Sequence, residues 1–179
     1  RLAAAGEGEG ALVWAREQTA GRGRRGRSWA SPVGNLYISV IVRPEKPASE
    51  AAQLSLVAAV ALADAFASIL PLEAEIACKW PNDILVDGGK TAGILLESSG
   101  AGNAVSWVVI GCGVNVVSHP AETNYPATDL NTVLGCSVPL ETVLERYLDT
   151  LFAWRDRWLA DGVAPVRRAW LDRAAGIGG

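Results

Sequence analysis

Residues 21–27 hold the densest group of side chains that could bind an anion. This run, GRGRRGR, alternates three glycines with four arginines, which are Arg22, Arg24, Arg25 and Arg27. Arginine presents a planar fork that matches phosphate or carboxylate oxygens two at a time. Glycine lets the backbone adopt conformations that other residues avoid and approach a ligand closely. The run therefore predicts a loop that wraps an anionic ligand.

A second group of polar side chains lies between residues 79 and 97. The segment KWPND (79–83) is followed seven residues later by Lys90, with the turn signal DGG (87–89) between them. That signal is typical of a hairpin, which would place Asp83 and Lys90 on adjacent strands facing one site. Lys79 ends an apolar strand, so it is expected to be partly buried and to pair with Asp83 or Glu97. A structural ion pair plus a surface lysine is the alternative.

The third informative segment is GCGVN (111–115), which ends an apolar run with two glycines and an amide. A strand end without side chains allows a flat ligand to approach the backbone. Asn115 supplies both a hydrogen-bond donor and an acceptor there.

Other interpretations of the arginine run remain. Its GxGxxG spacing matches the dinucleotide fingerprint, but that motif must open a helix, and the sequence SWASP that follows cannot. Arg/Gly runs also occur in nucleic-acid-binding tails, but such tails lie outside a fold, whereas this run stands between two apolar stretches. An ordinary solvated loop stays open on this stretch alone.

The elements that must position these groups can be read from the apolar patterns. Several short strands are joined by hairpins, and the helices do not alternate with them, which predicts an α+β fold with a mixed or antiparallel sheet packed against helices. Strands are expected at 11–17, 36–42, 75–80, 83–86, 90–97 and 105–110, helices at 49–70, 137–161 and 163–174, and a loop at 118–132.

Composition narrows the class of protein further. The 179 residues are half hydrophobic and carry a formal charge of −3, which argues for one compact domain and against a nucleic-acid partner. No uninterrupted apolar run reaches the roughly 20 residues that a bilayer requires, and no signal-peptide pattern opens the chain, so no membrane partner and a cytoplasmic location are expected. The three cysteines and the single His119 lack metal-ligand spacing.

Taken together, the three segments resemble those of the biotin protein ligases, in the same order and at similar spacing. The likeness spans residues 11–117. It implies an ATP-dependent, AMP-forming biotin–[acetyl-CoA-carboxylase] ligase that uses Mg²⁺, forms biotinyl-5′-AMP and transfers biotin to one lysine of a biotin carboxyl carrier protein or domain. A homodimer is one option, since homodimers are common in that family.

The resemblance also implies roles for individual residues. Lys90 would bridge the biotin carboxylate and the α-phosphate, with Arg22 and Arg24 as the other catalytic cations. Mg²⁺ would arrive with ATP, near Asp83. Biotin and its adenylate would contact Gln18, Gly21, Arg22, Gly23, Arg24, Arg27, Trp29, Lys90 and Gly93. The nucleotide side would include Asn82, Asp83, Gly113 and Asn115.

Two departures and one rival accompany the resemblance. The family's biotin-contacting Ser-Thr-Asn segment is absent, so residues 1–175 are expected to be a catalytic domain whose start is missing. Residues 176–179 are expected to begin a small barrel domain. The rival is a lipoate–protein ligase or octanoyltransferase, which shares the chemistry but would lack the arginine run.

Overall fold

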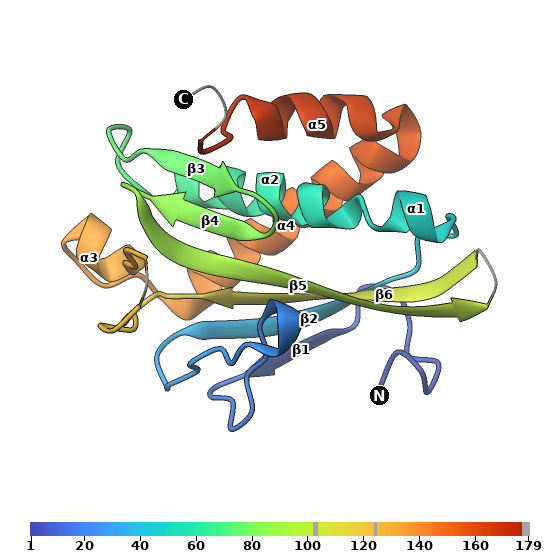
Figure 1. The fold of residues 1–179 in the computed structure, drawn as a ribbon, viewed down its shortest axis with the longest axis horizontal. Helices are drawn as coiled ribbons and strands as arrows, with labels where there is room; N and C mark the ends of the chain where they lie inside the picture. Colours follow the sequence, from blue (N-terminus) through green and yellow to red (C-terminus); the bar gives the residue numbers. More distant parts are fainter. Residues whose placement is uncertain (102–103, 124, 177–179) are drawn as a thin grey trace.

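A computed structural model describes residues 1–101, 104–123 and 125–176. The strands form one six-stranded sheet in the order β1-β2-β6-β5-β4-β3, with helices gathered along it (Figure 1). The strands are β1 Leu12–Ala15, β2 Leu36–Val42, β3 Ile76–Lys79, β4 Asp83–Val86, β5 Gly89–Ala101 and β6 Ala104–Val114. The α-helices are α1 Ala48–Ala51, α2 Leu54–Ala67, α3 Leu130–Leu134, α4 Leu140–Asp161 and α5 Val163–Leu171.

Every pairing between these named strands is antiparallel. The predicted α+β class and the predicted hairpin between β4 and β5 are therefore confirmed. Because successive residues of a strand point to opposite faces, Ile94 and Cys112 are buried on the helix side, while their neighbours Gly93 and Gly113, which pair with each other, face the other way.

The helix α2 is the centre of the core. Ten of its 14 residues are buried, including Val57, Leu62 and Phe66, and each buried side chain of this size stabilises the fold by about 1.5–3 kcal/mol. The helix α4 packs on it: the Trp154 indole donates to Asp64 at 2.6 Å, and the Thr150 hydroxyl donates to the Ala61 carbonyl at 2.8 Å.

One expectation about this region needs correction. The single helix expected at 49–70 is divided at Ala52–Gln53 into α1 and α2. The stretch Ala48–Ala67 also reaches 20 residues with a mean hydropathy of 1.4, so by length and composition alone it could cross a membrane. Most of it is buried inside the domain, which fits the core helix of a folded domain.

Other differences lie at the ends of the predicted elements and in the connections between them. The helix expected to begin at residue 137 begins at Leu140, and the helix expected to end at residue 174 ends at Leu171. Asp129 caps the short helix α3 by accepting from the Thr132 backbone N–H at 2.8 Å, and Gly135 ends it in a left-handed conformation. The expected loop at 118–132 therefore ends in a helix. β5 extends to Ala101 and β6 begins at Ala104, because the two strands keep pairing beyond residue 97, where the first of them was expected to end.

Candidate active site

A cavity of about 260 Å³ lies where the arginine-rich segment crosses the sheet. We call residues 18–31 the arginine loop. Eleven of the thirteen residues predicted for the site line this cavity, and they are Gln18, Arg22, Gly23, Arg24, Arg27, Trp29, Asn82, Asp83, Lys90, Gly93 and Gly113. Residues far apart in the chain thus meet at one place.

The arginine loop folds as a small hairpin of its own. Arg22 and Ser28 form a bridge at its base, and the Gly23 N–H donates to the Arg27 carbonyl at 2.7 Å. The tip is a short 3₁₀ turn, Arg24–Gly26. Glycine is needed at Gly21, because a Cβ there would lie 2.4 Å from the Trp29 carbonyl oxygen.

Trp29 lies flat on the sheet. A Cβ placed on Gly93 would come within 2.9 Å of its indole, and one placed on Gly113 would come within 2.7 Å of the indole nitrogen. The paired glycines Gly93 and Gly113 therefore make a flat floor. Of the two glycines in the segment 111–115, from which a surface for a flat ligand was predicted, only Gly113 belongs to it. Here the ring that rests on this floor belongs to Trp29.

The strands β4 and β5 bring Asp83 and Lys90 together, as the hairpin predicted. Lys90 Nζ lies 2.7 Å from Asp83 Oδ1, with side chains only 12% and 19% exposed. The Lys90 ammonium also stands 5.2 Å from the Trp29 ring and 5.3 Å from the Tyr125 ring. This is a partly dehydrated cation with one carboxylate partner, which suits an anionic ligand that approaches from the cavity.

Lys79 differs from the expectation. It is exposed, and its ammonium lies 5.8 Å from the Tyr125 ring. The two acids proposed as its partners are engaged elsewhere, Asp83 with Lys90 and Glu97 with Arg22. Because Lys79 ends β3, the edge strand of the sheet, its side chain reaches water without a buried partner.

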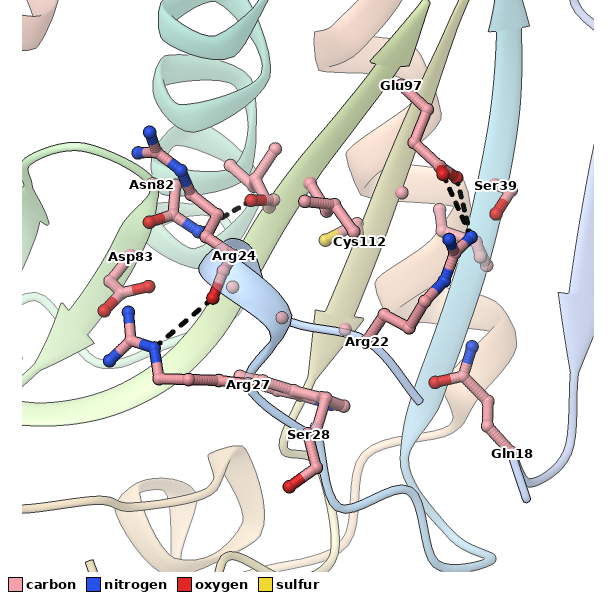
Figure 2. A pocket seen from close by; sticks show the side chains of 18 of the residues that line it. Gln18, Arg22, Arg24, Arg27, Ser28, Ser39, Asn82, Asp83, Glu97 and Cys112 are labelled. Carbon is pink, nitrogen blue, oxygen red and sulfur yellow. Dashed lines mark hydrogen bonds and ion pairs between the residues drawn. The ribbon is translucent and has the colours of Figure 1, made fainter. Parts of the chain in front are cut away.

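The arginines of the loop point in two directions. Figure 2 shows Arg22 directed at Glu97, whereas Arg24 and Arg27 extend toward the side of the cavity where Asn82 and Asp83 lie. Arg24 and Arg27 have no acidic partner among the residues that the structure describes. They are therefore available to an anion on the Lys90 side.

A model of the biotin/lipoate A/B protein ligase family matches residues 5–115. The chain belongs to this family. It is 48% identical over 176 residues to a biotin–[acetyl-CoA-carboxylase] ligase of Paracoccus denitrificans, a match that covers 94% of this chain and 72% of that protein. It is 39% identical to the bifunctional ligase/repressor BirA of Bacillus subtilis, covering 95% of this chain but only 53% of that protein.

Solved structures of the family share the fold. A biotin protein ligase from Aquifex aeolicus in complex with biotin and ATP superposes with a TM-score of 0.84 at 27% identity, covering 96% of this chain and 71% of that one. A biotin protein ligase from Leishmania major in complex with biotinyl-5-AMP gives 0.81 at 30% identity, covering 96% and 74%. The family predicted from the three sequence segments is confirmed.

Two residues predicted from the family resemblance do not line the cavity. Asn115 is buried, and its side-chain amide donates to the carbonyls of Lys90 and Thr128 at 3.3 and 3.1 Å. It ties β5 to the segment before α3. Gly21 lies at the base of the arginine loop, as described above. Their contacts with a ligand stay predictions.

Ten further residues line the cavity, and three of them show what the sequence reasoning missed or assigned to another role. Tyr125 comes from the segment at 118–132, where no periodic pattern marked it. Ser39 lies on β2 beside the floor, and its alternation with the buried Ile38 and Val40 could have revealed it. Glu97 was considered only as a partner of Lys79, although its spacing from Gly93 puts both on one face of β5.

The cysteine that lines the cavity, Cys112, is unsuited to act as a nucleophile. Burial raises the pKa of the Cys112 thiol to about 12. The thiol is therefore protonated at neutral pH and, lying against Tyr147 of α4, acts as part of the core.

Proposed function

We propose that this domain is the catalytic domain of an ATP-dependent biotin–protein ligase. The observation that carries the proposal is the convergence of Lys90, Arg24 and Arg27 on one cavity with a glycine floor. The relatives named as biotin ligases, and the structures with biotin, ATP and biotinyl-5-AMP, support the enzyme class predicted from the sequence. The biotin named for these proteins also disfavours the lipoate alternative.

The reaction has two steps. A biotin carboxylate oxygen attacks the α-phosphorus of ATP, the bond to the β-phosphate oxygen breaks, and pyrophosphate leaves with that electron pair. An acceptor lysine amine then attacks the biotinyl carbonyl, the bond to the AMP oxygen breaks, and AMP leaves while the amine loses a proton. Both reactants of the first step are anions, so cations placed between them lower the barrier, at tenfold in rate per 1.36 kcal/mol.

Lys90 is suited to that position. Its charge is held by Asp83 near the cavity floor, where low exposure to water strengthens its attraction for a ligand oxygen. We assign it to the carboxylate and the α-phosphate. Arg24 and Arg27 would bind phosphate oxygens from above, and Gln18, whose side chain accepts from the Ser31 hydroxyl at 2.7 Å, would face the biotin end.

The donor set for Mg²⁺ is small. Among the described residues no group of three or more His, Cys, Asp or Glu side chains gathers that could hold a metal ion. Asp83 is the carboxylate on the Lys90 side of the cavity. This fits an ion that takes most of its ligands from phosphate and water and one from protein. When bound with ATP, Mg²⁺ would screen the charge of the leaving pyrophosphate.

The acceptor would be a biotin carboxyl carrier protein or domain, in keeping with the name of the Paracoccus denitrificans relative. A cytoplasmic location fits the three free cysteines. A homodimer stays a prediction.

The test is ATP–pyrophosphate exchange with biotin, and with lipoate in a parallel reaction. Exchange that requires biotin and is absent with lipoate is the expected result. Exchange with lipoate alone would overturn the substrate assignment. Absence of exchange with either acid, together with no calorimetric binding of biotinyl-5′-AMP, would overturn the function proposed for this domain.

A further inference from the structure

Glu97 holds the base of the arginine loop. Arg22 Nη2 lies 3.0 Å from each of the two Glu97 carboxylate oxygens. Since Arg22 also bridges to Ser28, it marks the base of the loop's hairpin, whereas Arg24 begins the tip. Glu97 lies on β5, where it pairs with Val109 of β6. The contact therefore joins the glycine-rich arginine loop to a strand of the sheet (Figure 2).

This contact has no equivalent elsewhere in the loop. Across the described ranges, it is the one hydrogen-bonded ion pair that links residues 18–31 to a strand of the sheet. The other attachment is the packing of Trp29 on its glycine floor. Gly93 and Glu97 lie on the same face of β5, roughly 13 Å apart at 3.3 Å per residue. Two points on one strand thus fix the loop across the cavity.

This geometry gives Arg22 a different role from Arg24 and Arg27. The charge of Arg22 is neutralised by a fixed carboxylate, which competes with any ligand for that guanidinium. Arg24 and Arg27 keep their charge for the cavity. Their distance from a bound anion depends on where the base of the hairpin is held.

The ion pair is too exposed to matter much for folding. The Arg22 and Glu97 side chains are 69% and 47% exposed, and pairs of that kind contribute little to the stability of a whole domain. A glycine-rich loop with few contacts opens far more easily than the core, so the same small contribution changes its open fraction several-fold. Loss of the pair should therefore affect the loop and spare the fold.

We propose that Glu97 is a positioning residue that acts through Arg22 to hold the arginine loop closed over the biotinyl adenylate. This deepens the proposed function and rests on it. Glu97 sets how long the adenylate is retained, and the chemical step depends on Lys90, Arg24 and Arg27.

Limited trypsin digestion tests the loop contact without any ligand. Glu97→Gln is expected to be cleaved after Arg24, Arg25 or Arg27 about fivefold faster than the parent, because cleavage follows the open fraction. The matched control is Glu50→Gln. Glu50 lies on α1 and forms an exposed ion pair of 3.4 Å with Lys46, so the substitution removes the same charge from a similar pair. The control is expected to match the parent. Equal cleavage of Glu97→Gln and Glu50→Gln would overturn the proposal.

Adenylate release tests the consequence. Release of biotinyl-5′-AMP from Glu97→Gln is expected to be about fivefold faster, while kcat for pyrophosphate exchange at saturating biotin stays within about threefold. The charge-swapped variant Arg22→Glu with Glu97→Arg should restore slow cleavage by trypsin. Faster cleavage with unchanged release would overturn the positioning role. If the parent shows no exchange, the proposed function fails, and the trypsin comparison still decides the contact.

Discussion

Lys90 and Asp83 form an ion pair of 2.7 Å across the neighbouring strands β5 and β4, at the floor of the cavity. The register places Lys90 opposite Leu85 and Asp83 opposite Gly93, so the two side chains meet diagonally, where the pairing shifts between Ile84 and Leu85. Asp83 thus holds the Lys90 ammonium in place, while Lys90 still lines the cavity where a ligand would bind.

Lys90→Ala should therefore abolish adenylate formation. The loss of a charge placed on the reacting oxygens is expected to lower biotin-dependent pyrophosphate exchange at least about 100-fold. The circular dichroism spectrum should stay that of the parent. Lys46→Ala, which removes an exposed lysine, is the control and should exchange at the parental rate. An unchanged initial rate for Lys90→Ala would refute its role.

Arg24→Gly should weaken the retention of biotinyl-5′-AMP. A charged hydrogen bond to phosphate is worth about 1.5–3 kcal/mol, so release should be about 10- to 100-fold faster, with more labelling of unrelated lysines in a bystander protein. Arg25→Gly is the matched control, because Arg25 sits at the loop tip with φ 57° and does not line the main cavity. Equal leakage from both variants would count against the assignment.

Gly113→Ala should displace Trp29 from its floor. The added methyl would lie 2.7 Å from the indole nitrogen, closer than atoms can approach, so the ring must move. Biotin affinity measured by calorimetry is expected to fall about tenfold, or 1.4 kcal/mol. Gly8→Ala, at a glycine with open space around it, should bind like the parent. Parental affinity in Gly113→Ala would show that the floor does not shape the site.

Asp129 should make stability depend on acid pH. Burial raises the pKa of its carboxyl, but hydrogen bonds from Thr132 and His119 outweigh burial and hold the pKa below its usual value. A lowered folded-state pKa contributes stability above the unfolded pKa, near 3.9, and that contribution is lost as pH falls through the folded value.

The corresponding variant is Asp129→Ala. At pH 7 its free energy of unfolding in urea should be about 0.5–2 kcal/mol below that of the parent, because a helix cap is lost. The difference should shrink below pH 4. Asp149→Ala, at an exposed acid of α4, should show neither effect. A difference that stays constant from pH 7 to pH 3 would contradict this account.

Much of the site could be predicted because its residues fall into short runs with local signals. The Asp87-Gly88 turn fixes the β4–β5 hairpin, so Asp83 and Lys90 must be neighbours whatever the rest of the chain does. The glycines at 93 and 113 are conspicuous inside apolar strands, and their purpose becomes clear once the register pairs them.

What escaped prediction depends on contacts between distant segments. Tyr125 reaches Lys90 because the segment before α3 pairs with β5 through the Lys90–Ala127 bridge, which no periodicity reveals. The direction of Arg22 is set by Glu97, 75 residues away. The helix α3 is a different case, since its caps Asp129 and Gly135 were visible in the sequence and the helix itself is only five residues long.

The position of α2 has a consequence for synthesis on the ribosome. Its cover on one side is α4, which begins at Leu140, 73 residues after α2 ends at Ala67. At 5–20 residues per second, roughly 4–15 seconds pass before synthesis of that cover begins. During this interval the nascent chain presents the apolar helix α2 without the helix that covers it, so its yield in cells should depend on chaperones that bind emerging chains.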